Sequence, residues 1–480
     1  MRASTLLASA ALLAVSLAPL AAADGDFDPT FGFGSGYVTW NGGGSVEVAD
    51  GVALADGTLI GVGTYDTPST APVLHWQAFS RTGIQLNQAC YRAPGELFAF
   101  SSTSHGLTAL VDSAGRLLVG GWARFPITGA AERPIVAAFD LSQTGCVLDS
   151  SFSGNGWLVL PGPSVNDCTG SSDCRVVDLA EIRPETGAVA EPRIVAEVEV
   201  SLSSTYVDTR VVALTQDGTI DSGFGIGGFT DLYMVDYQNA GFRYPIEVDG
   251  RGGIVLAGAM FYNELRFPVA FRFTADGAID LDFANEGALA LDPPAAPGST
   301  RQSIASEAAV LPNGRYLFSG ENFDEADPDS WPRGDLHFPL ADAVTSGDVW
   351  TVGIAAVGPV PLVAQGNGRT IAVVNERWNQ QGTLFSEATV VQRWGEAWQD
   401  ELFGTQGERV IDFDFGGGNR ETVTEALLAS GRIVLAGTAD ESATTTTGFL
   451  VRLNNSYLFA DGFEWGTAAG WSSGVGVLLP

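Results

Sequence analysis

Apolar and polar positions alternate over short stretches of this chain, and the stretches are separated by turns. Residues 271–274, for example, read Phe-Arg-Phe-Thr and lead into the Asp-Gly pair at Asp276-Gly277. Alternation with a period of two is typical of a half-buried strand, and Asp-Gly is a common hairpin turn. The 60 glycines and 23 prolines interrupt the whole chain in this way. We therefore expect an all-β protein built from short strands.

One turn motif, Asp-x-x-Phe-x-x-x-Gly, recurs along the chain. Its Asp side chain can accept a backbone N–H bond from two residues ahead, while its Phe enters the core. Successive aspartates are 121, 72, 59 and 120 residues apart, so two copies are missing near 88 and 340. Degenerate copies stand there, with Asn87 and Cys90 in one and Asp335 and Phe338 in the other. The clear copies are Asp28/Phe31 (with its glycine one place late, at Gly36), Asp149/Phe152/Gly156, Asp221/Phe224/Gly228, Asp280/Phe283/Gly287 and Asp400/Phe403/Gly407.

A second motif, an apolar run between two glycines six residues apart, falls once between copies of the first. It starts at Gly57, Gly115, Gly252, Gly314 and Gly431, and in weaker form at Gly187 and Gly368. Both motifs therefore indicate seven units with a period of about 62 residues.

Each unit has room for about four strands, which in the first unit we place near 36–40, 50–54, 58–63 and 73–79. One such sheet cannot bury both of its faces, so it must pack against its neighbours. We expect an all-β propeller of about seven four-stranded blades built from repeats of about 60 residues. An open solenoid is the alternative, although it would need polar terminal caps, and a parallel β-helix usually has far shorter repeats.

The two ends differ from the repeats. Residues 1–23 have the basic start, apolar run and Ala-rich end of a signal peptide cleaved near Ala23. A membrane anchor is the alternative, but the run is short and no stop-transfer charges follow. We therefore expect a secreted, periplasmic or cell-surface protein, with repeats over 24–460. Residues 461–480 form a tail, and the stretch around Phe459-Ala460-Asp461 is either a separate motif or an eighth repeat turn.

Charge narrows the choice of partner. The net charge is −32, and all 24 basic residues are arginine. Nucleic-acid binding depends on cationic contacts to phosphate, so we expect none. Without lysine there is no P-loop lysine and no Schiff base. We expect no cofactor and no membrane span after the signal peptide, although such an acidic chain leaves Ca²⁺ open as a ligand.

The four cysteines are consistent with an oxidising compartment. We pair Cys168 with Cys174 across the turn between them, which leaves Cys90 for Cys146. A zinc site is the alternative, but this spacing is unusual for ligands and the chain has only three histidines.

The histidines belong to no recognised catalytic motif. His75, His105 and His337 lie outside any metalloprotease motif. The acidic stretches 24–28 and 324–329 lack the remaining residues of a calcium loop. With 56 acidic residues, a pair of catalytic carboxylates cannot be identified by spacing, because the separation that matters is spatial.

The motif copies, such as Asp221-Ser222-Gly223-Phe224-Gly225-Ile226-Gly227-Gly228, make the chain resemble the delta-60 repeat family. The resemblance covers most of residues 24–460 and is poor near 87 and 335. It implies a bacterial secreted or surface protein with a propeller-like fold and no assigned activity.

The functional expectation is a monomeric, non-enzymatic propeller that binds an unknown protein or glycan, or serves as a scaffold. The alternative is a hydrolase or lyase that uses carboxylates on an extracellular polymer. That alternative predicts carboxylates from several blades in one place, at least one with a raised pKa.

Overall fold

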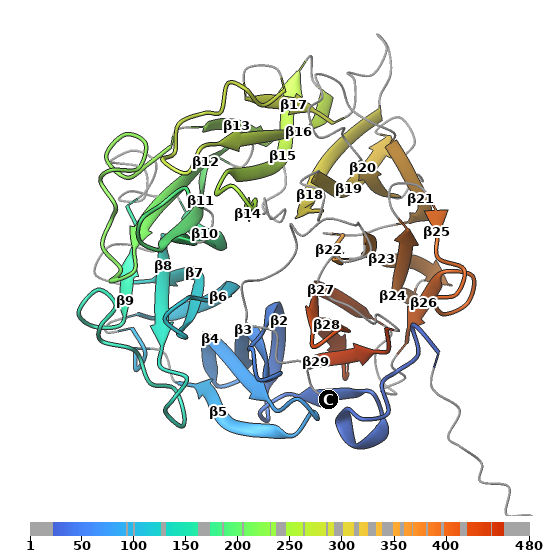
Figure 1. Ribbon diagram of the computed structural model, residues 1–480. Coiled ribbons are helices and arrows are strands. Elements are labelled where there is room, and N and C mark those ends of the chain that lie inside the picture. The colour runs from blue at the N-terminus through green and yellow to red at the C-terminus, as the bar shows by residue number, and fades with distance from the viewer. Residues whose placement is uncertain are drawn as a thin grey trace, which may run out of the picture.

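The computed structural model shows a closed ring of β-sheets around a central axis (Figure 1). The described residues are 23–92, 95–98, 101–125, 131–161, 173–184, 187–203, 206–230, 232–236, 246–262, 265–284, 287–291, 301–311, 316–324, 333–337, 349–355, 360–366, 368–380, 383–394, 398–412, 420–442 and 444–455. They form seven antiparallel sheets, six of four strands and one of five, so the fold is the expected β-propeller with four-stranded blades.

The first four blades follow the chain in order, each running from an innermost to an outermost strand. Blade 1 contains β2 (Ser45–Ala53), β3 (Leu59–Thr67), β4 (Thr70–Phe79) and β5 (Gln85–Tyr91); blade 2 contains β6 (Thr103–Val111), β7 (Leu117–Arg124), β8 (Glu132–Phe139) and β9 (Trp157–Val159); blade 3 contains β10 (Asp173–Ile182), β11 (Arg193–Ser203), β12 (Tyr206–Thr215) and β13 (Leu232–Asp236); blade 4 contains β14 (Ile246–Val248), β15 (Ile254–Tyr262), β16 (Leu265–Phe273) and β17 (Ala288–Ala290).

The last three blades complete the ring. Blade 5 contains β18 (Arg301–Val310), β19 (Tyr316–Asp324), β20 (Arg333–His337) and β21 (Val349–Ala355); blade 6 contains β22 (Leu362–Ala364), β23 (Arg369–Gln380), β24 (Thr383–Trp394), β25 (Trp398–Gln399) and β26 (Glu408–Ile411); blade 7 contains β27 (Glu421–Ala429), β28 (Arg432–Asp440), β29 (Thr446–Leu453) and β1 (Tyr37–Trp40).

The ring closes through the N-terminal strand. β1 pairs antiparallel with β29, with Tyr37 opposite Val451 and Trp40 opposite Gly448. The expectation that residues 36–40 belong to the first blade is therefore wrong. The sequence repeat runs from turn to turn, whereas a blade begins one strand later, so the first strand of the first repeat is the last strand of the last blade. This pairing excludes the open solenoid, whose two ends would remain apart.

The core consists of layers between blades. Seven apolar clusters occur among the described residues, and each joins two neighbouring blades around the ring. Between blades 2 and 3, for instance, Leu118 and Val136 pack with Val176 and Val198. Each sheet is thus covered on both faces by its neighbours, which is why an isolated repeat could not bury its apolar side chains.

Candidate functional site

The recurring aspartates of the turn motif form the hydrogen bond that their spacing predicts. In all five clear copies the Asp Oδ1 accepts a hydrogen bond from the amide two residues ahead, as in Gly223 to Asp221 over 2.9 Å. The motif glycines adopt a positive φ, which glycine does without steric cost. These are the aspartates Asp28, Asp149, Asp221, Asp280 and Asp400, and the glycines Gly156, Gly228, Gly287 and Gly407.

The motif phenylalanines lie in the core rather than at a surface site. Four of the five rings are fully buried, and the fifth, Phe283, is partly buried. The four buried rings are those of Phe31, Phe152, Phe224 and Phe403, each with 0% of its surface exposed. Phe31 packs in the layer between blades 7 and 1, and Phe403 packs in the layer between blades 6 and 7. Because no solvent reaches them, these four residues cannot contact a ligand directly.

Arginines that belong to neither sequence motif link these turns to the next blade. The guanidinium of Arg193 lies 2.7 Å from Asp221 Oδ2, covers the Phe224 ring and donates to the carbonyl of Ala275 in blade 4. Arg116 of blade 2 likewise donates to the Gln216 carbonyl of blade 3 over 2.6 Å. Arg452 of blade 7 pairs with Asp28, covers the Phe31 ring and donates to a carbonyl in the turn of blade 1. The Asp and Phe residues therefore hold neighbouring blades together.

Blades 1 and 2 are joined by a disulfide. Cys90 is bonded to Cys146, which confirms that predicted pair. Cys90 replaces the motif Phe, and Cys146 follows Gly145 in the corresponding turn of blade 2. In blade 3 the same place holds Gly218, against which Phe152 packs so closely that an added Cβ would lie 2.8 Å from the ring. A covalent bond thus joins blades 1 and 2, whereas a Phe–Gly contact joins blades 2 and 3.

The remaining cysteines and degenerate motifs are only partly described. Cys174 is disulfide-bonded, whereas Cys168 lies outside the described residues. Asn87 lies within β5 and Asp335 within β20, so neither degenerate copy occupies a turn. Phe338 lies outside the described residues, as do residues 1–22, where a signal peptide is expected, and residues 456–480.

Of the three histidines, His75 is fully buried and His105 is partly buried. His75 is completely buried, and burial lowers its pKa to about 4. His105 stacks on Trp122 with ring centroids 4.0 Å apart, and its pKa is also lowered to about 4, by burial and by the nearby Arg124. Both imidazoles are therefore neutral at pH 7. The side chain of His337 lies outside the described part of the chain.

The acidic stretch 24–28 is neutralised by arginine. Asp24 pairs with Arg369, Asp26 with Arg409, and Asp28 with Arg452. The stretch 324–329 lies outside the described side chains. Within the described residues no three His, Cys, Asp or Glu side chains are grouped to hold a metal ion. No helix in the described ranges has the length and hydropathy needed to cross a membrane.

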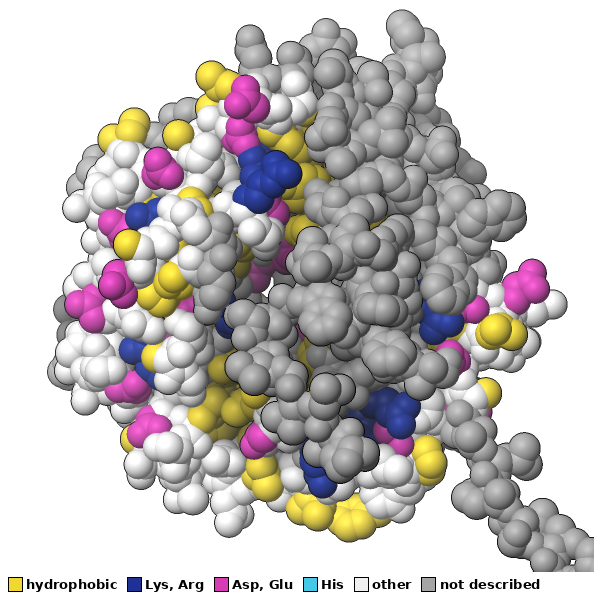
Figure 2. Space-filling model, viewed as in Figure 1, with side chains coloured by type: hydrophobic (Ala, Val, Ile, Leu, Met, Phe, Trp, Pro, Cys, Tyr) yellow, Lys and Arg dark blue, Asp and Glu magenta, His cyan; other side chains and the backbone are white. Residues whose placement is uncertain are grey.

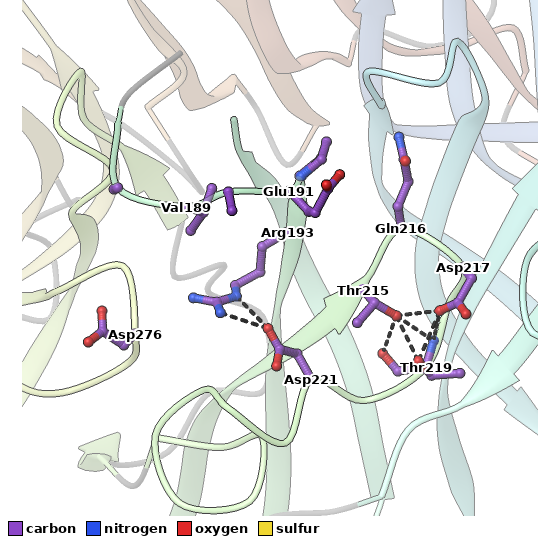
Figure 3. Close-up of a pocket in the computed structure, with 12 residues that line it drawn as sticks. Val189, Glu191, Arg193, Thr215, Gln216, Asp217, Thr219, Asp221 and Asp276 are labelled. Carbon is purple, nitrogen blue, oxygen red and sulfur yellow. Dashed lines mark hydrogen bonds and ion pairs between the residues drawn. The ribbon is translucent and has the colours of Figure 1, made fainter. Parts of the chain in front are cut away.

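A groove of about 680 Å³ lies between blades 3 and 4 (Figure 3). One wall is formed by residues 188–192 of the connection between β10 and β11, and the other walls are the turns after β12 and β16. Arg193 and Asp221 form an ion pair at its base, with Asp276 on one side and Asp217 on the other. The described lining residues are Ala188, Val189, Ala190, Glu191, Pro192, Arg193, Thr215, Gln216, Asp217, Thr219, Asp221 and Asp276.

The groove exists because blade 3 departs from the repeat. The connection between its two inner strands contains ten residues, whereas the equivalent connections of the other six blades contain two to five. In the sequence this insertion falls at the weak motif copy beginning at Gly187, within the 72-residue interval between Asp149 and Asp221. The interval is longer than the 59 residues that follow, and this excess is the signal that could have located the insertion.

The polar groups of the groove differ in how firmly they are held. Asp217 accepts hydrogen bonds from the hydroxyls of Thr215 and Thr219, which lower its pKa and keep it ionised. The side chains of Glu191 and Asp276, by contrast, make no hydrogen bond or ion pair among the described residues. These two carboxylates are therefore available to a ligand. On the face of the molecule that Figure 2 shows, the acidic side chains of the described residues are spread out, with arginines among them.

Carboxylates also recur on the innermost strands of the blades. Five innermost strands carry a β-bulge at the same position, and the residue after the bulge is Asp50, Asp178, Glu307 or Glu425 in four of them and Thr108 in the fifth. Asp50 Oδ2 accepts the amide of Ala109 in blade 2 over 2.7 Å, and Asp178 Oδ2 accepts the amide of Ile246 in blade 4 over 2.6 Å. The bulge acids therefore bridge neighbouring inner strands.

Several of these carboxylates hold protons unusually tightly. Burial, and then the charge of Asp50, raise the pKa of Asp178 to about 7. Burial, and then the charge of Asp178, raise the pKa of Glu247 to about 7. Glu197, which is paired with Asp178 across β10 and β11, is fully buried and makes no side-chain hydrogen bond to another described residue, and its pKa lies well above the usual range. Acidic groups from blades 1, 3 and 4 thus influence one another near the axis of the ring.

Comparison with known proteins found one family model and several solved structures. The model of a family described as "Domain of unknown function (DUF5122) beta-propeller" matches residues 428–456. No curated protein matches. Similar solved structures include the polysaccharide lyase Uly1 (TM-score 0.47, 10% identity, 86% of this chain and 91% of that one) and an α-L-arabinofuranosidase, Arb93A from Fusarium graminearum (0.41, 12%, 85% and 93%). The chain is also similar to the Dos1 propeller (0.41, 7%, 85% and 78%).

Proposed function

We propose that the chain is a secreted, non-enzymatic β-propeller that binds an extracellular protein or glycan in the groove between blades 3 and 4. The observation that carries this proposal is the ten-residue connection of blade 3, which interrupts an otherwise regular repeat and walls a groove of about 680 Å³. Ligand sites commonly have volumes of about 300–1,000 Å³, with a few polar groups that fix orientation. The residues shared by all repeats have packing roles, so a blade-specific feature is the better candidate for recognition.

Two arrays, one of glycans and one of peptides, test this proposal when probed with the purified chain. The variant Ala190→Trp places a large side chain in the groove from an exposed loop position, so it should block binding without disturbing the core. The matched control is Glu401→Gln, an exposed acidic position in the turn of blade 6. We expect saturable binding by the wild type and by the control, and loss of binding in Ala190→Trp. Absence of saturable binding on both arrays contradicts the proposal.

A second candidate function is cleavage of an extracellular polymer by the carboxylates of the inner strands, through either a hydrolase or a lyase reaction. The observation favouring it is that Asp178 and Glu247 have pKa values near 7, where a carboxyl group can donate or accept a proton at neutral pH. A panel of neutral and acidic polysaccharides tests it, with new reducing ends and unsaturated products as readouts. Activity that is lost in Glu247→Gln and kept in Glu401→Gln would support it. Activity unchanged in Glu247→Gln, or no activity on any polymer, would remove this candidate.

A further inference from the structure

The groove between blades 3 and 4 continues into a second, smaller cavity. That cavity has a volume of about 280 Å³ and is lined by Ala188, Arg251, Gly253, Arg272, Thr274, Ala275 and Asp276. Ala188 and Asp276 line both cavities, so the two are lobes of one groove. We call them the acidic lobe, which contains Glu191, Asp217 and Asp276, and the arginine lobe, which contains Arg251.

The two lobes carry opposite charges. The acidic lobe contains four carboxylates and one guanidinium, and that guanidinium, of Arg193, is already paired with Asp221. The arginine lobe contains two guanidinium groups, with Asp276 at its border. A charged ligand would therefore meet a negative potential at one end of the groove and a positive one at the other.

Each lobe contains a charged side chain that makes no hydrogen bond or ion pair among the described residues. Arg272 is held by Asp249 at 2.7 Å and by Asp280, so it cannot turn toward a ligand. The exposed side chain of Arg251 makes no hydrogen bond or ion pair among the described residues. Arg251 is therefore the cation that the groove can offer to a ligand, as Glu191 and Asp276 are its available carboxylates.

We propose that the groove takes a peptide segment of a partner protein that carries both charges, a Lys or Arg side chain for the acidic lobe and a carboxylate for Arg251. This inference rests on the function proposed above. Guanidinium and carboxylate groups form short, paired hydrogen bonds, and complementary charges fix the direction in which a segment lies. A peptide is favoured over a glycan because the described lining of both lobes contains no aromatic side chain on which a sugar ring could stack.

The experiment probes an array of random heptapeptides with the purified chain and with three variants. Arg251→Glu reverses the charge of the arginine lobe, the double variant Glu191→Gln/Asp276→Asn neutralises the acidic lobe, and Glu401→Gln is the control. We expect the wild type and the control to select peptides with one basic and one acidic residue at a fixed separation. The affinity of Arg251→Glu for these peptides should be lower by about tenfold, or about 1.4 kcal/mol. This variant should instead select peptides in which a basic residue replaces the acidic one. The double variant should lose the preference for the basic residue.

Four results overturn the inference, and the first three are distinguishable from failure of the proposed function. If the selected peptides carry no charge preference, or if the charge variants select the same peptides as the wild type, the inference is wrong. The groove remains the binding site in that case, provided that Ala190→Trp abolishes binding. If glycans bind, peptides do not, and Ala190→Trp blocks the glycans, the peptide assignment alone fails. If Ala190→Trp leaves all binding intact, the groove is not the site and both proposals fail.

Discussion

The indole Nε1 of Trp40 donates a hydrogen bond to Nε2 of His75 over a distance of 3.0 Å. Trp40 belongs to the N-terminal strand β1 of blade 7, and His75 belongs to β4 of blade 1. The other ring nitrogen of His75 lies 2.7 Å from the carbonyl of Cys90, so Nδ1 carries the hydrogen and Nε2 accepts. One buried histidine therefore connects the closing strand of the ring to the blade that bears the disulfide.

Removing this donor should weaken the closure. In Trp40→Phe the buried Nε2 of His75 loses its partner, and an unsatisfied buried polar atom costs about 1–3 kcal/mol. We expect the free energy of unfolding, measured by urea denaturation, to fall by that amount. The control is Trp157→Phe, because the indole N–H of Trp157 makes no hydrogen bond among the described residues. Equal losses in the two variants would show that ring size, rather than the hydrogen bond, is responsible.

Acidification should destabilise the protein through His75. Its pKa is about 4 in the folded chain and about 6.5 when unfolded, so between these values the unfolded state binds more protons. The stability contributed by this group is therefore complete above pH 6.5 and decreases as the pH falls toward 4, by at most about 3 kcal/mol. The measurement is the unfolding free energy of wild type and His75→Gln at several pH values. Their difference should shrink toward pH 4, and a constant difference would contradict the lowered pKa.

Glu247 should act in the opposite direction. Its pKa is raised from about 4.5 to about 7, so the folded state binds more protons in this window and stability falls as the pH rises through it. Glu247→Gln keeps a neutral group of the same shape and should remove up to about 3 kcal/mol of that pH dependence. Urea denaturation at pH 4.5 and pH 8 measures this. We expect the variant to lose less stability than the wild type over the interval, and a parallel decline in both would disprove the raised pKa.

The residue after the motif Phe adopts a left-handed conformation in all five clear copies. Gly32, Gly225 and Gly404 occupy it in three copies, but Ser153 (φ 51°) and Ala284 (φ 48°) occupy it in the other two. A left-handed Ser or Ala costs more than glycine does, so Ser153→Gly and Ala284→Gly should each stabilise the protein by about 0.5–1 kcal/mol in thermal or urea unfolding.

The reverse change gives the matched test of that turn. In Gly225→Ala the new Cβ would approach the Phe229 carbonyl oxygen far inside van der Waals contact, so we expect clear destabilisation in the same assay. If both glycine variants are destabilised and Gly225→Ala is tolerated, then φ at this position does not limit stability.

Much of this fold is predictable from the sequence because its repeat is local. The Asp–Phe turn depends on a hydrogen bond between residues two apart, as in Asp221 and Gly223, so it is visible as a motif. The all-β class and the four-stranded blades follow from patterns of this kind, whereas the Cys90–Cys146 pair is reached by elimination, once Cys168 is paired with Cys174. The pairing of β1 with β29 in blade 7 does not follow from such a pattern, because it joins Tyr37 to Val451, and only the closed ring brings these two residues together.

The candidate site is less predictable for the same reason. Its groove residues come from three separate connections, and only the long interval between Asp149 and Asp221 hints at the insertion that forms one wall. The inner-strand acids are invisible as a set, because each follows a β-bulge that exists only once the strands are paired, as at Asp50 and Asp178. The arginines that hold the blades together, such as Arg193, are similarly defined by carbonyls of the next blade.

Exchanging one loop shows whether the groove between blades 3 and 4 binds the partner. Replacing the ten-residue connection 183–192 with the five-residue turn 112–116 of blade 2 removes a wall of the groove and leaves the strands unchanged. We expect this variant to keep the far-ultraviolet circular dichroism and the cooperative unfolding of the wild type. We also expect it to lose binding to the partner identified on the arrays. A folded variant that binds with wild-type affinity would contradict the assignment of the groove between blades 3 and 4 as the binding site.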